Sequence, residues 1–136
     1  MTIDIQRQVS VAIENQPGRL GQIGRLLAGR GLHIAAFSVI DNVEQGMVRL
    51  MTSDPAAARE ALRSAGLPVV EVEVLVVEMM DGIGNLALLG EALAAADINI
   101  EYAYASTAEI GRPGRLIVKT ANPRSARDVL ASLRES

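Results

Sequence analysis

The feature that most constrains this chain is an internal repeat, because residues 15–20 align with residues 81–86 when the sequence is shifted by 66 positions. Six positions are identical at this shift: Gly18/Gly84, Leu20/Leu86, Gly24/Gly90, Leu27/Leu93, Ala28/Ala94 and Ile34/Ile100. Beyond a two-residue insertion the shift becomes 68 and places Pro55 over Pro123. Similarity over blocks of this length predicts a duplicated unit, and both copies are expected to have the same fold.

Length and composition agree with two small units. A chain of 136 residues is long enough for one ordinary domain or for two very small ones. Of these residues 49% are apolar but only 2% are aromatic, so Ala, Val, Leu and Ile have to form the core. Small domains have much surface for their volume, and we therefore expect part of the apolar surface to contact a second subunit in a homodimer.

Each unit carries the same order of secondary-structure signals. In the first unit the alternation of residues 9–13 is typical of a half-buried strand, and apolar residues at three- and four-residue spacing predict a helix near 18–30. Two strands joined by a polar loop are expected over 33–52. A capping side chain directly before a proline predicts second helices near 55–65 and 123–134.

The fourth strand of the two units is predicted to be unusual. Residues 69–79 form a β-branched run without a turn, so the last strand of the first unit continues into the first strand of the second. Shifting this run back by 66 gives residues 3–13, and we expect residues 2–6 to complete the second unit beside residues 75–80. The repeats are assigned to residues 1–73 and 74–136, and the long central strands to about 3–13 and 69–80.

The β-α-β-β-α-β order, the turn Asn15-Gln16-Pro17-Gly18-Arg19-Leu20 and the strand opening Gly31-Leu32-His33-Ile34 resemble the ACT domain in both halves of the chain. The resemblance implies an α+β fold of two ferredoxin-like βαββαβ units, with an antiparallel sheet and its helices on one face. It covers nearly the whole chain and leaves no catalytic domain over. ACT domains commonly sense amino acids and regulate biosynthetic enzymes, so the resemblance implies a stand-alone, non-catalytic, amino-acid-binding regulatory protein.

The resemblance also implies where a ligand binds. In serine-sensing members of the family an asparagine in the turn and one opening the second strand hold the effector; Asn15 matches the first and Asn99 the second. The remaining two positions differ, with His33 in the first repeat and Asp81 in the second, and an upstream histidine is absent from both, which argues against serine. The candidate ligand-binding residues are Asn15, Gln16, Pro17, Gly18, Arg19, Leu20, His33, Asp81, Gly82, Ile83, Gly84, Asn85, Leu86 and Asn99.

The chemistry of these turns also follows from the residues themselves. A glycine between strand and helix, Gly18 or Gly84, lets backbone N–H groups point outward at a helix N-terminus, where the helix dipole favours a carboxylate. Asp81 or the side-chain carbonyl of Asn15 can accept a hydrogen bond from an ammonium group, and Asn99 or His33 could hold the other end of the ligand. Turns of this composition are also ordinary loop punctuation, so a purely structural role stays open for each copy.

Two other pairs of residues have competing interpretations. Gly24 and Gly90 lie mid-helix at the same repeat position, which predicts a close approach of the helix to the sheet or to a second subunit rather than access for a ligand. Tyr102 and Tyr104, expected on the same face as Ile100, are assigned to a subunit or ligand interface, with core filling as the alternative.

Arginines and methionines near the turns are weaker candidates. Arg19 and Arg112 could pair with a ligand carboxylate through two parallel hydrogen bonds, although most such residues are simply solvated. Met79 and Met80 could form an adaptable apolar wall, although core filling is the default role of methionine.

Charge and composition argue against several classes of protein. Thirteen basic and sixteen acidic residues give a net charge of −3, and a chain with so few aromatic rings is a poor candidate for binding nucleic acid. With no Cys and a single His, we expect no disulfide, metal site or cofactor. The N-terminus lacks the basic start of a signal peptide, and the apolar runs are shorter than the roughly 20 residues that span a bilayer, so a cytoplasmic protein without a membrane segment is expected.

The observations favour a regulatory protein whose ligand is a free amino acid and whose further partner is a metabolic enzyme. The alternative is a ligand-free interaction or oligomerisation module that regulates such an enzyme. A small enzyme of the acylphosphatase type would need an arginine and an asparagine converging on a phosphate, and Arg19 with Asn15 is a weak match, so no catalytic residue is assigned.

Overall fold

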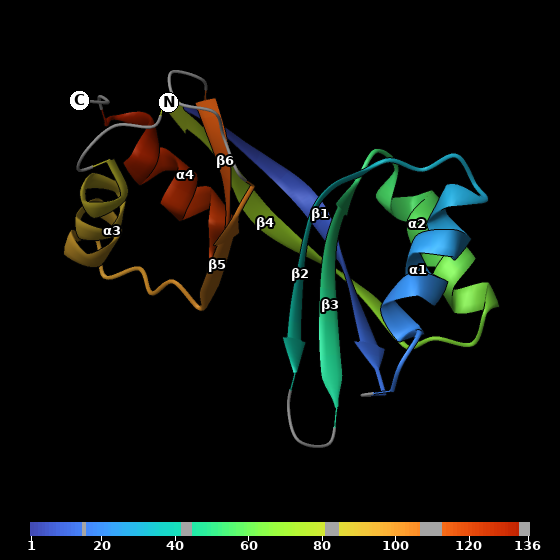
Figure 1. The fold of residues 1–136 in the computed structure, drawn as a ribbon. Helices are drawn as coiled ribbons and strands as arrows, with labels where there is room; N and C mark the ends of the chain where they lie inside the picture. Colours follow the sequence, from blue (N-terminus) through green and yellow to red (C-terminus); the bar gives the residue numbers. More distant parts are fainter. Residues whose placement is uncertain (15, 42–44, 81–84, 107–112, 134–136) are drawn as a thin grey trace. The chain divides into compact units, whose positions relative to one another are not determined.

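The computed structural model describes residues 1–14, 16–41, 45–80, 85–106 and 113–133, apart from the side chains of Asp41 and Met80. The elements are β1 (Thr2–Ile13), α1 (Arg19–Ala28), β2 (Ile34–Asp41), β3 (Gly46–Thr52), α2 (Pro55–Ser64), β4 (Val69–Met80), α3 (Asn85–Ala95), β5 (Tyr102–Ala105), β6 (Pro113–Lys119) and α4 (Pro123–Ala131) (Figure 1). Their order repeats as the sequence predicts. Within the described part of the chain, no helix has both the length and the apolar character that crossing a membrane requires.

The chain divides into two compact units. The first-repeat unit is Arg7–Val72, and the second-repeat unit combines Met1–Gln6 with Glu73–Ser136. The twelve-residue strands β1 and β4 contribute residues to both units. In the second-repeat unit Met1, Ile3 and Ile5 pack against the core formed by β4, β6 and the two helices.

The strands form an antiparallel α+β arrangement in each unit, with the hydrogen-bonded order β2-β3-β1-β4-β6-β5. In the first-repeat unit β3 pairs with β1, as in Val9 opposite Leu50, and with β2. In the second-repeat unit β6 pairs with β4, as in Leu75 opposite Val118, and with β5. The predicted fold class of two ferredoxin-like units with long shared central strands is confirmed.

The core of each unit lies between its strands and its two helices. In the first-repeat unit, alternate residues of β1 and β3 point to one face, where they meet helix residues spaced four apart. This cluster contains Val9, Val11, Ile13, Ile23, Leu27, Val48, Leu50, Ala58 and Leu62. The matching cluster of the second-repeat unit contains Leu75, Val77, Leu89, Leu93, Val118, Ala126 and Leu130. Small aliphatic side chains therefore do form both cores.

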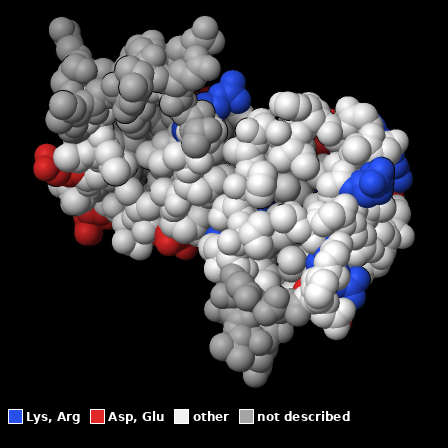
Figure 2. Space-filling view, viewed as in Figure 1, with Lys and Arg blue, Asp and Glu red and all other residues white. Residues whose placement is uncertain are grey.

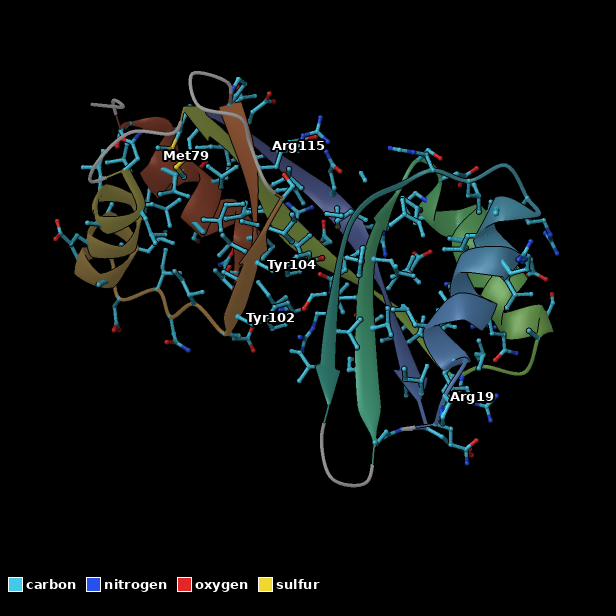
Figure 3. All side chains as sticks on the ribbon, viewed as in Figure 1. Arg19, Met79, Tyr102, Tyr104 and Arg115 are labelled. Carbon is cyan, nitrogen blue, oxygen red and sulfur yellow. The ribbon has the colours of Figure 1, made fainter. Side chains whose placement is uncertain are left out.

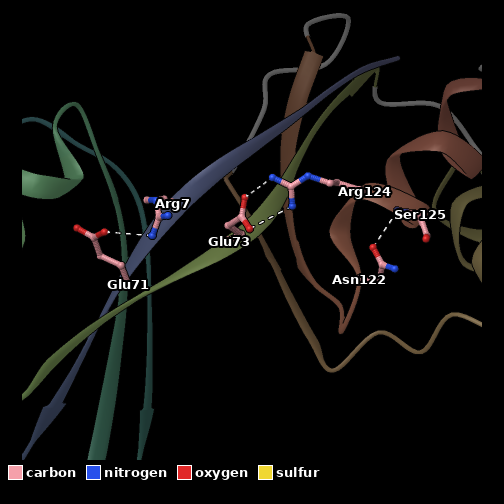
Figure 4. A network of polar contacts seen from close by, with 6 residues as sticks. All are labelled: Arg7, Glu71, Glu73, Asn122, Arg124 and Ser125. Carbon is pink, nitrogen blue, oxygen red and sulfur yellow. Dashed lines mark hydrogen bonds and ion pairs between the residues drawn. The ribbon is translucent and has the colours of Figure 1, made fainter.

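The predicted caps begin both second helices. Asp54 Oδ1 accepts from the Ala57 N–H at 3.1 Å, and Asn122 Oδ1 accepts from the Ser125 N–H at 3.1 Å, each before a proline in the first helical turn. In the second-repeat unit Arg124 also joins α4 to β4 through two hydrogen bonds to Glu73, at 3.3 and 3.1 Å (Figure 4).

A weaker contact ties the two long strands together in the first-repeat unit. Arg7 Nη1 of β1 lies 3.4 Å from Glu71 Oε2 of β4 (Figure 4). The Arg7 side chain is 60% exposed whereas that of Glu71 is 10% exposed, so water screens the cation and the pair adds only modestly to the pairing of the strands.

The prediction that Tyr102 and Tyr104 share a face with Ile100 is wrong. Ile100 packs against the helix-facing core, whereas Tyr102 and Tyr104 pair with Lys119 and Ile117, which alternate with the core residue Val118 (Figure 3). Glu101 and Tyr102 both lie opposite Lys119, because the Glu101 N–H donates to the Lys119 carbonyl and Tyr102 is the partner of Lys119 in the ladder. The extra residue is a β-bulge, and beyond it each side chain points to the face opposite to the one that simple alternation predicts. The first repeat has its register shift between Ile34 and Ala36, at the same repeat position.

The predicted close approach of the mid-helix glycines to the sheet is also wrong. A Cβ atom built on Gly24 or on Gly90 meets no atom within 4 Å. The shared glycine therefore does not serve packing within either unit, and only the second part of the prediction, contact with another subunit, stays a prediction.

Candidate ligand-binding site

The turn between β1 and α1 is shaped by Gly18. Its φ of 90° lies in the left-handed region that side chains disfavour, and it precedes Arg19, the first residue of α1. Gly18 provides no side-chain cap, and the first turn of α1 contains no acidic residue. The N–H groups and the positive dipole end at this terminus are therefore not offset by a side chain of the helix, which favours an anionic group there.

A cavity of about 270 Å³, here called the turn cavity, opens at this helix start. It lies wholly within the first-repeat unit, between the end of β1, the start of α1, the end of β2 and the start of β3. Its lining residues are Ile13, Glu14, Gln16, Gly18, Arg19, Leu20, Gly21, Val39, Ile40 and Gly46. The structure thus brings together four of the predicted residues, Gln16, Gly18, Arg19 and Leu20.

A second cavity of about 420 Å³, here called the loop cavity, lies between β1, α1 and the segment that follows α2. It is lined by Ala12, Ile13, Glu14, Arg19, Gln22, Gln45, Ala65, Gly66, Leu67 and Pro68. Both cavities share Ile13, Glu14 and Arg19, so these side chains form part of the boundary of each.

Arg19 is the centre of the polar contacts at the turn, beside the end of β1 (Figure 3). Its Nη2 donates to Glu14 Oε2 and to Gln16 Oε1, both at 3.3 Å, and its Nη1 donates to Gln22 Oε1 at 3.2 Å. The Arg19 side chain is 34% exposed and that of Glu14 is 69% exposed. A cation and an anion therefore lie together at the cavity with water access, in a pair whose own contribution to stability is small.

The net charge of the first-repeat unit differs from that of the second. Arg7–Val72 holds seven arginines and six acidic residues, a formal charge of +1, whereas the other unit holds six basic and ten acidic residues, a charge of −4. Basic atoms gather over α1 and α2 in Figure 2, and acidic atoms lie along the outer side of the unit that contains α3. The electrostatic environment of the turn cavity is therefore more favourable for an anion than that of the second repeat.

The predicted strand residue His33 does not meet the turn of its own repeat. His33 follows the C-terminal end of α1, where its N–H donates to Ser53 Oγ at 3.2 Å, and α1 has ten residues. A helix of that length spans about 15 Å, so His33 and the turn cavity lie at opposite ends of α1. Asn99 is exposed and likewise follows the end of α3.

The structure describes only part of the second turn. Asn15 and the predicted residues Asp81, Gly82, Ile83 and Gly84 lie outside the described residues, as does Arg112. Of the two remaining predicted positions, Asn85 is buried, with 2% exposure at the start of α3, and Leu86 is 68% exposed. Pro17 is exposed beside Gly18.

Several cavity residues were not predicted from the sequence. Glu14 directly follows β1, and Val39, Ile40 and Gly46 reach the turn because β3 pairs with both β1 and β2. The ladder sets Gly46 opposite Ile13 on one side and opposite Asp41 on the other. A predicted strand order would have revealed this meeting of three strand ends.

Among the described residues, no group of three or more His, Cys, Asp or Glu side chains is placed to hold a metal ion.

The sequence matches the family model described as an ACT domain pair over residues 1–135, and the chain belongs to that family. Its structure is similar to that of a protein from Bacteroides thetaiotaomicron, with a TM-score of 0.87, 26% identity, and coverage of 95% of this chain and 88% of that one. A comparison with curated proteins found no match.

Two solved regulatory subunits of aspartate kinase share the fold. The subunit from Thermus thermophilus, in its ligand-free form, has a TM-score of 0.70 at 18% identity and covers 99% of both chains. The subunit from Thermus flavus has a TM-score of 0.64 at 19% identity and covers 96% of this chain and 95% of that one. ACT domains are regulatory modules, and the tandem arrangement found here is of that class.

Proposed function

We propose that this protein is a non-catalytic, cytoplasmic regulatory protein that binds a free amino acid at the turns between the first strand and first helix of its repeats. The observation that carries the proposal is the turn cavity, where a guanidinium, a carboxylate and an uncapped helix N-terminus meet. An amino acid carries one positive and one negative group on the same carbon. The cavity offers a partner of opposite sign to each of them.

The expected contacts follow from hydrogen-bonding capacity. A ligand carboxylate would accept from the Arg19 guanidinium and from N–H groups at the start of α1. A ligand ammonium would donate to Glu14, which accepts through two oxygens, and to the side-chain carbonyl of Gln16. Neither step forms or breaks a covalent bond, which is why we assign binding and no reaction.

In a homodimer, ligand binding at the turn cavity would affect the contact between the two copies. Val39 and Ile40 line the turn cavity and belong to the edge strand β2, which also exposes Phe37. If a second copy covers this edge, a ligand in the cavity alters the surface that the copy contacts. Ligand binding would then shift the assembly by its differential affinity for the two states, an effect of about 1–3 kcal/mol. A metabolic enzyme could read that shift, as the similarity to regulatory subunits of aspartate kinase suggests.

A thermal-shift screen against the twenty amino acids tests the proposal. We expect at least one amino acid to raise the melting temperature, because a ligand that binds only the folded state stabilises it by mass action. Glu14→Ala and Arg19→Ala should each remove that shift, because these side chains are the proposed partners of the ligand ammonium and carboxylate groups. Asp128→Ala, an exposed position on α4, is the control and should leave the shift intact. Binding that neither turn variant weakens would refute the site, and no shift with any amino acid would refute the function.

A ligand-free interaction module is the second candidate, and α3 favours it. Its outward positions Leu86, Ala87, Ala94 and Ala95 are apolar and exposed, and Glu91 is the only charged residue of the helix. A helix that is apolar on all sides is usually covered by another part of a protein. This candidate predicts that no amino acid alters the melting temperature.

A further inference from the structure

The turn cavity of the first repeat has an aliphatic wall beside its pair of charges. Besides Glu14, Gln16, Arg19 and three glycines, it is lined by Ile13, Leu20, Val39 and Ile40. Its volume of about 270 Å³ lies just below the range of roughly 300–1,000 Å³ typical of sites for drug-sized ligands. Such a site suits a small molecule with one charged end and one branched hydrocarbon end.

The charge pair can be exchanged for the charges of a ligand. Arg19 and Glu14 meet through one contact of 3.3 Å, and both side chains are accessible to water. Solvent-accessible ion pairs of this kind contribute little to stability, so separating the two side chains costs little free energy. A zwitterion inserted between them replaces one ion pair with two.

The second repeat lacks the same combination. At the 66-residue shift, Glu14 corresponds to Met80 and Arg19 to Asn85, which is buried, with 2% exposure. Val39 corresponds to Ala105, so the branched side chain is missing as well. Asp81 is the acidic residue of that turn, and no arginine stands at the position that corresponds to Arg19.

We infer that the ligand is an α-amino acid with an aliphatic side chain, bound as its zwitterion at one site per chain, in the first-repeat unit. Arg19 receives the α-carboxylate, Glu14 receives the α-ammonium, and the side chain contacts Val39 and Ile40. This inference rests on the proposed function and adds the class of ligand and the repeat that binds it.

Calorimetric titration of the full chain tests the class and the number of sites. We expect L-leucine, L-isoleucine or L-valine to bind with one site per chain, and L-aspartate and L-lysine to bind at least about tenfold more weakly because an aliphatic wall cannot solvate a second charge. Tighter binding of a charged amino acid, or two equal sites per chain, would overturn the inference while leaving the proposed function standing.

Ligands that lack one charge assign the two contacts. L-Leucinamide lacks the carboxylate, and 4-methylpentanoate lacks the ammonium group. Glu14→Gln should lower the affinity for L-leucine about tenfold or more, because hydrogen bonds to a charged group are the strong ones. The affinity for 4-methylpentanoate should stay unchanged. Arg19→Gln should lower the affinity for L-leucine by a similar factor and leave the affinity for L-leucinamide unchanged. The unchanged analogue in each variant also reports that the variant has folded.

Asp81→Ala is the matched control in the second repeat and should alter neither the affinity nor the number of sites. Loss of binding in this variant, with Glu14→Gln and Arg19→Gln unaffected, would move the site to the second repeat and contradict the inference alone. Equal weakening of all three probes by Glu14→Gln would show that Glu14 supports the turn instead of receiving an ammonium group, and would likewise overturn the assignment. No heat with any amino acid would refute the proposed function and the inference together.

Discussion

Thr52 and Thr120 occupy the same position in the two repeats, and each has a buried hydroxyl oxygen. Among the described residues, neither oxygen has a hydrogen-bond partner. A buried polar group left unpaired costs about 1–3 kcal/mol. Thr52 and Thr120 match at the 68-residue shift. The free-energy cost of an unpaired hydroxyl can therefore be measured twice, in two similar environments.

We expect Thr52→Val and Thr120→Val to raise the free energy of unfolding by about 1 kcal/mol each, because valine has the same shape and no unpaired hydroxyl. Urea denaturation measures the change. Thr2→Val, at an exposed position of β1, is the control and should alter stability by less than about 0.5 kcal/mol. A loss of stability at either buried threonine would mean that its hydroxyl is in fact hydrogen-bonded.

Single residues also show what the sequence could and could not predict at the site. Gly18 was predicted to open the turn because only glycine readily adopts a positive φ, and its φ is 90°. Glu14 and Gln22 were not predicted, because their part in the site depends on the position of the Arg19 guanidinium, with which both form hydrogen bonds. Composition and spacing do not report such side-chain contacts.

At the scale of elements, periodicity predicted the strands and helices in their correct order. It failed for the direction of Tyr102 and Tyr104, since a single extra residue opposite Lys119 reverses which side chains face the helices. The same strand in the first repeat has its irregularity between Ile34 and Ala36. The position of a bulge depends on the partner strand, so alternation along one strand does not reveal it.

The mid-helix glycines provide a prediction for α1 and α3. With no atom within 4 Å of an added Cβ, Gly24→Ala and Gly90→Ala should each raise the free energy of unfolding by about 0.5–1 kcal/mol, the advantage of alanine over glycine inside a helix. Chemical denaturation of each variant measures this. Gly18→Ala is the opposite control, because its positive φ makes a Cβ unfavourable and stability should fall. If either helix variant loses stability together with self-association, that helix contacts a second subunit.

At the scale of the whole molecule, the duplicated chain keeps two different sheet edges. β2 has eight residues and exposes Phe37, Val39 and Ile40, whereas β5 has four residues, with alanines at the positions of Phe37 and Val39. Long apolar edge strands readily pair with another chain, and short edges are one way to prevent this. The scarce aromatic residues thus mark where the repeats have diverged, with Phe37 on one edge strand and Tyr102 and Tyr104 on the other.

This difference predicts where the proposed homodimer forms. Phe37 is 56% exposed and lies opposite the core residue Leu50 at the border of the helix-facing side. We expect Phe37→Glu to convert the dimer to a monomer in sedimentation experiments, because burying an unpaired carboxylate in an interface is costly, while the exposed position leaves the stability of the unit nearly unchanged.

The matched control is Ala103→Glu, which introduces the same charge at the corresponding position of β5 and should leave the dimer intact. Because Val39 and Ile40 belong both to this edge and to the turn cavity, the monomeric variant should also lose any effect of an amino acid on assembly. A dimer that survives Phe37→Glu but dissociates with Ala103→Glu would place the interface on the other edge. The turn cavity would then lie away from the interface, and a ligand bound there would need another route to influence assembly.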